Sequence, residues 1–159
     1  MASSDDFVIT DLFVYGTLKR GECRESMWPR VPTLVRPGFI RGRLYDLGPY
    51  PAIRVEEFAG EEDDLQDLDW VAGELWSFQV GDIAATIAVL DEIEQSNQRG
   101  YRNLYDQVLV RVHDRPRSRT SQLALAYQYS SPSRLDHSRR LRPGSGDTAV
   151  GWWALPDDR

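Results

Sequence analysis

The stretch FVYGTLKRG, Phe13–Gly21, decides how the chain is interpreted. Its apolar part is rich in β-forming residues and predicts a buried strand, LFVY, over Leu12–Tyr15. Gly16 ends this strand, and backbone N–H groups beyond a strand end can bind an anion. A simple strand-to-turn junction explains the same residues, and the pattern alone favours it. A phosphate loop is a poor match because no second glycine precedes a Lys-Ser or Lys-Thr pair.

A later helix carries an acid on its apolar face. The sequence predicts this helix from an N-cap at Asp82 to about Glu94. Its apolar residues recur every three to four positions and Glu94 continues the same stripe. The stripe consists of Ile83, Ile87, Leu90 and Glu94. The neighbouring acids Asp91 and Glu92 point away from it and are expected to face solvent.

The position of Glu94 leaves two interpretations open. In the first, which the pattern alone favours, the helix ends at Ile93 and Glu94 reaches water. In the second, Glu94 is partly buried and lines a cavity. Burial disfavours the charged form of a carboxyl and raises its pKa. A glutamate tuned in this way is a good general base near neutral pH.

The remaining elements are mostly strands. Strands are predicted at Phe39–Leu47, Pro51–Val55, Trp70–Phe78, Asp106–His113 and Ser121–Ser130. The last two alternate strictly and should form an antiparallel hairpin. A short helix is expected within Glu22–Trp28, and a final edge strand or ordered cap at Gly151–Pro156. Many strands with one good helix indicate a mixed α+β fold with a tightly curled or closed sheet, not a doubly wound nucleotide-binding fold.

Length and charge limit the classes of protein further. A chain of 159 residues fits one domain, 1–159, in which 1–10 are expected to be flexible and 131–159 to form a C-terminal extension. The net charge of −6 disfavours nucleic acid or an anionic membrane as the main partner. No apolar signal segment or bilayer-spanning run is visible, so a cytoplasmic protein is expected.

Three charged stretches are interpreted as surface loops. The basic stretches Arg115–Arg119 and Ser138–Pro143 are rich in Ser and Pro and lack interleaved aromatic residues, so solvated loops are favoured over a binding patch. The acidic stretch Glu56–Asp69 lacks the regular spacing of cation ligands and is expected to be a surface loop. No metal site is predicted.

Two motifs in order identify a family. YGTL, residues 15–18, follows an N-terminal strand, and LDEIE, residues 90–94, closes a later helix. Together they resemble the gamma-glutamylcyclotransferase-like family, which includes gamma-glutamylamine cyclotransferases and bacterial and plant members of uncertain substrate. The segment GRLYDLGPYPAI, Gly42–Ile53, resembles the family's strand-turn-strand with its Tyr-Pro step. The resemblance extends from about Leu12 to Tyr129.

This resemblance implies a fold and a reaction. The implied fold is a small mixed β-barrel flanked by helices. In the implied reaction, the α-amine of a γ-glutamyl group attacks its own γ-carbonyl, which gives 5-oxoproline and a free amine or amino acid without a cofactor. The only implied partner is thus a small γ-glutamyl substrate. By position in the second motif, Glu94 is the implied general acid and base.

The resemblance also implies which residues bind the substrate. The backbone of Gly16, Thr17 and Leu18 should hold the substrate α-carboxylate, and Tyr15 should line the same pocket. Tyr105 matches a family tyrosine, with Tyr101 as a rival. Tyr127 and Tyr129 share a strand face, and one of them is expected at the pocket, with Tyr127 as the candidate. Core packing is the alternative for all of these tyrosines.

The chain departs from the family pattern at two places. Gln95 follows the motif glutamate where glycine is common, and Asp106-Gln107 follow Tyr105 where two arginines are common. These changes put substrate contacts in question more than the base. The alternative function is a non-catalytic protein that binds a small carboxylated metabolite in the same cavity.

Overall fold

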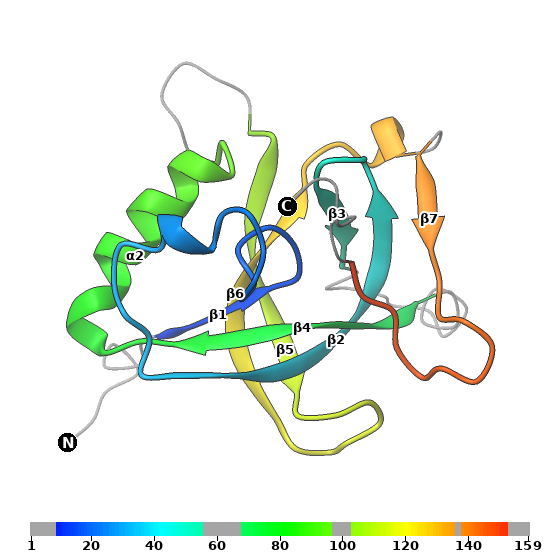
Figure 1. Ribbon diagram of the computed structural model, residues 1–159, viewed down its shortest axis with the longest axis horizontal. Coiled ribbons are helices and arrows are strands. Elements are labelled where there is room, and N and C mark those ends of the chain that lie inside the picture. Colours follow the sequence, from blue (N-terminus) through cyan, green and yellow to red (C-terminus); the bar gives the residue numbers. More distant parts are fainter. Residues whose placement is uncertain (1–8, 56–67, 97–102, 136–137, 153–159) are drawn as a thin grey trace.

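A computed structural model describes residues 9–55, 68–96, 103–135 and 138–152 (Figure 1). The strands are β1 (Asp11–Val14), β2 (Leu34–Asp46), β3 (Pro51–Arg54), β4 (Asp69–Ser77), β5 (Tyr105–His113), β6 (Ser121–Tyr129) and β7 (Arg139–Leu141). The helices are the α-helix α2 (Val80–Ile93) and the short 3₁₀ helices η2 (Glu25–Met27) and η3 (Pro132–Leu135). The predicted α+β class is confirmed.

Five strands close into a barrel. The sheet order is β3-β2-β4-β1-β6-β5, and β2 pairs again with β5 at Phe39 and His113, which closes the ring. Only the β1–β6 pairing is parallel among the described strands, at Leu12 and Leu125. β3 and β7 lie outside the ring and both pair with β2. The predicted small mixed barrel is therefore confirmed, with one α-helix beside it in the described chain.

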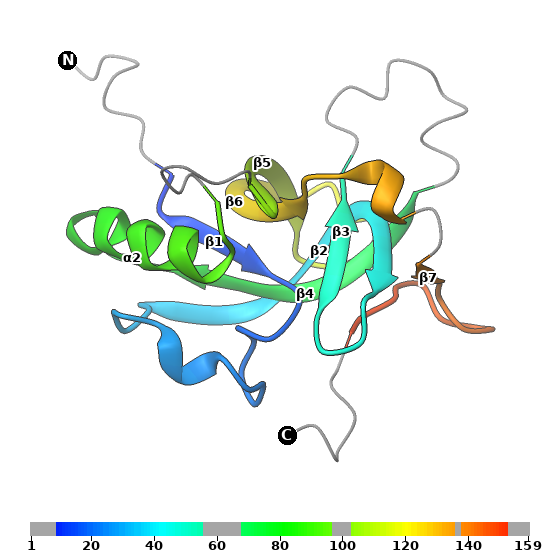
Figure 2. The ribbon, with the colours of Figure 1, turned by 90° about the horizontal axis from the view of Figure 1, so that it is seen from above.

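The apolar run of β1 is buried on both faces. Leu12 and Val14 belong to a cluster of buried residues that includes Ile83 and Leu90 of α2. Phe13 and Tyr15 belong to a second cluster that fills the barrel. A strand that is buried on both sides needs a continuous apolar sequence rather than an alternating one, which explains LFVY. Figures 1 and 2 show α2 beside the barrel, on the side away from β7.

The helix α2 differs slightly from its prediction. It begins at Val80, two residues before the expected cap Asp82, and the actual N-cap Gln79 makes no side-chain cap hydrogen bond. Ile83, Thr86 and Leu90 are its buried residues, so the predicted stripe faces the barrel. The helix ends at Ile93, and the backbone N–H of Glu94 still donates to the carbonyl of Leu90 at 2.8 Å.

Most strands match their predicted positions within two residues. The exception is β2, which begins at Leu34 instead of Phe39 because residues on both sides of Pro37-Gly38 pair continuously with β4, from Leu34–Ser77 to Gly42–Asp69. The predicted β5–β6 hairpin is confirmed, with register from Tyr105–Tyr129 to His113–Ser121. In the tail, Val150 forms a single parallel bridge with Val71.

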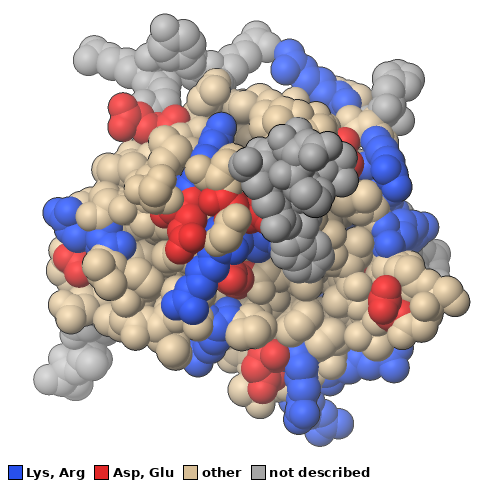
Figure 3. Space-filling model, in the orientation of Figure 1, with Lys and Arg blue, Asp and Glu red and all other residues tan. Residues whose placement is uncertain are grey.

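The structure agrees with the prediction for one of the three charged stretches and disagrees with it for another. Arg115, Arg117 and Arg119 are exposed in the β5–β6 loop, as predicted. The second basic stretch was wrongly expected to be a loop: it contains β7, and Arg140 forms an ion pair with Asp69 at 3.2 Å. The acidic stretch lies outside the described residues except for its end. Basic and acidic side chains are intermixed on the face in Figure 3.

No helix in the described chain is both long enough and apolar enough to cross a membrane. The expected absence of nucleic-acid and membrane partners stays a prediction.

Candidate active site

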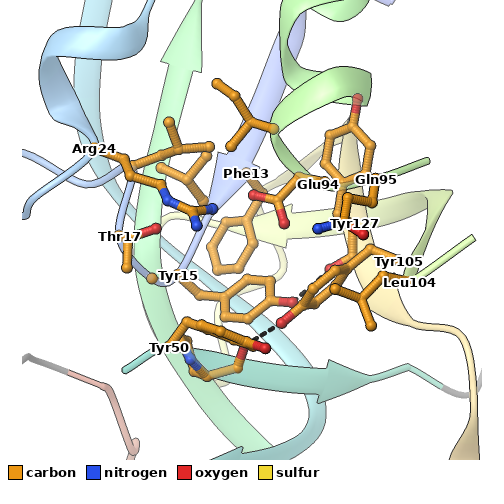
Figure 4. Close-up of a pocket in the computed structure, with 15 residues that line it drawn as sticks. Phe13, Tyr15, Thr17, Arg24, Tyr50, Glu94, Gln95, Leu104, Tyr105 and Tyr127 are labelled. Carbon is orange, nitrogen blue, oxygen red and sulfur yellow. Dashed lines mark hydrogen bonds between the residues drawn. The ribbon is translucent and has the colours of Figure 1, made fainter. Parts of the chain in front are cut away.

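One pocket opens between the end of β1, the end of α2 and the tyrosines of β5 and β6 (Figure 4). Its walls come from five separate segments of the described chain. They are Phe13–Leu18 with Arg24, Tyr50–Pro51, Ile93–Gln95, Leu104–Tyr105 and Tyr127. All of the predicted site residues, Glu94, Tyr15, Gly16, Thr17, Leu18, Tyr105 and Tyr127, therefore lie around one cavity, while their roles stay predictions.

The loop after β1 is a compact turn. The N–H of Lys19 donates to the carbonyl of Gly16 at 3.1 Å, and the N–H of Arg24 donates to the carbonyl of Thr17 at 2.8 Å. Gly21 makes this reversal possible because its φ of 82° lies in the left-handed region that other residues rarely adopt. The loop is also held by Lys19, whose buried ammonium group donates a hydrogen bond to the carbonyl of Trp152.

The first residues of this loop supply unused backbone donors. In the described part of the chain, the N–H groups of Gly16, Thr17 and Leu18 donate to no acceptor. Thr17 and Leu18 are buried, so leaving such groups unpaired in the absence of a ligand is costly. An anion that accepts from these groups would remove that cost. The turn at the end of β1 thus has the features of an anion-binding loop.

Glu94 lies across the pocket from this loop, immediately after α2. Figure 4 shows its carboxyl directed into the cavity, facing Arg24. Burial raises the pKa of this carboxyl from its ordinary 4.5 to about 7, and the positive charge of Arg24 opposes the rise. Both interpretations of the sequence were partly correct, since the helix does end at Ile93 and the carboxyl nevertheless lines a cavity.

The raised pKa of Glu94 predicts how stability depends on pH. The folded protein holds the proton more tightly than the unfolded chain, so folding stability falls as pH rises from about 4.5 to about 7. The gap between these pKa values corresponds to about 3 kcal/mol above pH 7. Glu94→Gln has no such proton, so its free energy of unfolding should exceed that of the native chain at pH 8 and match it near pH 4. Urea unfolding at both pH values measures this, and equal differences at both would contradict it.

Three tyrosines are fixed around the carboxyl by hydrogen bonds. The hydroxyl of Tyr105 donates to the carbonyl of Pro51 at 2.8 Å, and that of Tyr15 donates to the carbonyl of Tyr127. The hydroxyl of Tyr127 donates to Oδ1 of Asp91 at 2.6 Å. Burial raises the pKa of all three phenols, so they are neutral at ordinary pH. They give the cavity walls that combine apolar ring surfaces with hydrogen-bonded hydroxyl groups.

The rival tyrosines have separate outcomes. Tyr129 is buried and packs edge-to-face on Tyr105, with ring centroids 5.5 Å apart, but it does not line the pocket. Tyr127, which was the candidate of the two, does line the pocket. Tyr101 lies outside the described residues.

Sequence reasoning missed several residues of the site. Asp91 was wrongly expected to be an ordinary solvent-facing acid; it accepts the hydrogen bond of Tyr127 because β6 lies next to the last turn of α2. Arg24 lines the pocket and was not predicted, because only the Gly21 turn returns it to Thr17. Tyr50 also lines it and contacts the ring of Tyr105, with centroids 6.4 Å apart. The Tyr-Pro step of the sequence, Tyr50-Pro51, was the feature that could have identified Tyr50 as a site residue.

Comparisons with known proteins agree with this geometry. Residues 12–153 match the family described as gamma-glutamyl cyclotransferase, AIG2-like. A gamma-L-glutamyl-butirosin B gamma-glutamyl cyclotransferase from Niallia circulans is 31% identical over 128 residues, which cover 79% of this chain and 70% of that protein.

Solved structures share the fold at lower identity. An AIG2-like protein from Mus musculus has a TM-score of 0.52 and 20% identity, covering 88% of this chain and 91% of that chain. YkqA from Bacillus subtilis has a TM-score of 0.53 and 19% identity over 77% of this chain. The match spans only 36% of the YkqA chain.

Proposed function

Because this chain belongs to the gamma-glutamyl cyclotransferase, AIG2-like family, we propose that it cyclises a γ-glutamyl substrate to 5-oxoproline and releases a free amine or amino acid. The observation that carries the proposal is the position of Glu94. A carboxyl with a pKa of about 7 faces, across one pocket, a loop in which the N–H groups of Gly16, Thr17 and Leu18 donate to no acceptor within the described chain. The carboxyl of Glu94 can move a proton while the N–H groups of the loop hold an anion.

The reaction needs a nucleophile that is already in place. The α-amine and the γ-carbonyl belong to the same glutamyl group, so ring closure benefits from a high effective concentration. The α-amine is mostly protonated at neutral pH and attacks only after it loses a proton. The main task for the protein is therefore to place the glutamyl group and to manage protons.

Glu94 would carry one proton from the attacking nitrogen to the leaving nitrogen. Its carboxylate accepts a proton from the α-amino nitrogen as the new C–N bond forms at the γ-carbon. The resulting carboxylic acid then donates that proton to the departing nitrogen as the original amide C–N bond breaks. A pKa near 7 suits both steps, because neither form of the carboxyl is scarce near neutral pH. The N–H groups of Gly16, Thr17 and Leu18 would hold the substrate α-carboxylate throughout.

A release assay tests the proposal. The purified chain is incubated with γ-glutamyl amines and γ-glutamyl dipeptides, and 5-oxoproline is followed by mass spectrometry. The relative from Niallia circulans is named for gamma-L-glutamyl-butirosin B, so that compound belongs in the panel. Enzymatic 5-oxoproline is the expected result. No product from any substrate, with 5-oxoproline still bound by the folded protein, would instead favour a non-catalytic metabolite-binding protein.

The pH–rate profile should follow the ionisation of Glu94. The base form is the carboxylate, so kcat/KM should rise with pH and reach half of its plateau near pH 7. An unperturbed glutamate would reach its plateau well below pH 6. Initial rates from pH 5 to 9 measure the profile, with a substrate whose α-amine titration is known separately. A rate that is already constant between pH 5.5 and 8 would contradict Glu94 as the base.

A further inference from the structure

Arg24 is the one lysine or arginine among the described residues that line the pocket. Its backbone N–H donates to the carbonyl of Thr17 at 2.8 Å, which places Arg24 beside Thr17 in the loop after β1. Figure 4 shows its guanidinium entering the cavity beside Thr17, on the side opposite Tyr105 and Tyr127. The turn at Gly21 brings it there, seven residues after Thr17.

The guanidinium of Arg24 is half-buried and has unused hydrogen-bonding capacity. In the described chain it makes no side-chain hydrogen bond and no ion pair. It interacts electrostatically with Glu94 across the cavity. That carboxyl is substantially protonated near neutral pH and so only partly compensates the arginine. A partly desolvated guanidinium favours a bound carboxylate, to which it donates two parallel hydrogen bonds.

We propose that Arg24 binds the α-carboxylate of the γ-glutamyl substrate, together with the backbone N–H groups of Gly16–Leu18. The inference rests on the proposed function for the identity of the carboxylate. Arg24 then acts in specificity: it selects substrates with a free α-carboxylate over those in which this group is an amide or ester.

The α-carboxylate fits better than a carboxylate on the leaving group. Arg24 is joined to Thr17 by a backbone hydrogen bond, so its side chain and the unpaired N–H groups converge on the same end of the pocket. Glu94 lies opposite and must reach the scissile amide. The leaving group departs beyond that amide, whereas the α-carboxylate remains on the glutamyl side, with the loop.

Matched substrates isolate this contact. KM and kcat are measured for a γ-glutamyl anilide and for its α-carboxamide analogue, with the native chain and with Arg24→Gln. For the α-carboxylate substrate the variant should lose about 10- to 100-fold in kcat/KM, mostly through KM, as expected for a charge-assisted hydrogen bond. For the carboxamide the loss should be at most about twofold, and Arg24→Lys should recover part of the activity.

The control is Arg20→Gln, which removes the same charge from an exposed position on the same loop outside the pocket. This variant should resemble the native chain with both substrates. Equal losses by Arg24→Gln on both substrates would overturn the inference, as would a loss that depends on a carboxylate in the leaving amino acid.

A binding measurement separates this inference from the proposed function. Calorimetry with 5-oxoproline and 5-oxoprolinamide requires no turnover. If the native chain makes no product yet prefers 5-oxoproline, and Arg24→Gln abolishes that preference, the inference stands and the proposed reaction fails. If the native chain turns over γ-glutamyl substrates and Arg24→Gln keeps the full preference, the reaction stands and the inference fails.

Discussion

Glu94→Gln should reduce kcat by about 10²- to 10⁴-fold, the usual contribution of a positioned general acid and base. Glutamine has nearly the same shape as glutamate and can still accept a hydrogen bond, so the pocket should keep its geometry. It cannot take the proton from the α-amine or return one to the leaving nitrogen. Formation of 5-oxoproline in steady state measures the loss, and 5-oxoproline binding by calorimetry shows that the site is intact.

Glu92→Gln is the matched control for this variant. Glu92 is an exposed acid in the last turn of α2, and Glu92→Gln makes the same carboxyl-to-amide change outside the pocket. It should retain native activity. A Glu94→Gln protein that binds 5-oxoproline and keeps more than about half of native kcat would exclude Glu94 as the proton carrier and would move that role to solvent.

Gly73→Ala should destabilise the fold by about 3 kcal/mol, at the upper end of the range for overpacked cores. A Cβ at this position would lie 2.5 Å from the carbonyl oxygen of Val14 and 2.6 Å from the ring of Phe13. The first neighbour is backbone in a paired strand, so neither β1 nor β4 can move without loss of the register that joins them. Urea or thermal unfolding measures the change in free energy.

Gly81→Ala provides the control, because a Cβ there would meet nothing within 4 Å. Gly81 lies in the first turn of α2, where alanine has the higher helix propensity. This variant should be as stable as the native chain or more stable. A Gly73→Ala protein with native stability would mean that the barrel adapts where β1 pairs with β4, contrary to the close contacts of Gly73 with Val14 and Phe13.

Most strands could be predicted because the pattern of apolar and polar residues within each strand is enough to identify it. β5 and β6 alternate in sequence and in structure, and their register follows from the hairpin. β2 was predicted too short because Pro37 and Gly38 interrupt its pattern, while pairing with β4 on both sides of them preserves the strand. β7 was missed because three residues rich in arginine have no strand signal, and only pairing with β2 creates it.

The site was predictable only as far as two motifs define it. The YGTL loop and Glu94 were named from sequence, but the burial of Glu94 depends on β5 and β6, whose tyrosines close the space around it. Asp91 was misassigned because helical periodicity treats the helix alone, and a neighbouring strand decides which side chains face protein. Residue spacing in the sequence could not identify Arg24 as a pocket residue. The left-handed backbone conformation of Gly21 sets the path of the chain between Thr17 and Arg24.

The hydrogen bond from Lys19 to Trp152 joins the loop after β1 to the last described residue. During synthesis, the strand β1 and its loop are made before Trp152, which follows Lys19 by 133 residues. The loop that we propose holds the substrate therefore lacks one of its supports until Trp152 has been added to the chain. A stop codon placed before Trp152 should therefore yield a chain that contains every predicted site residue but has a loosened site, because the ammonium group of Lys19 loses this acceptor.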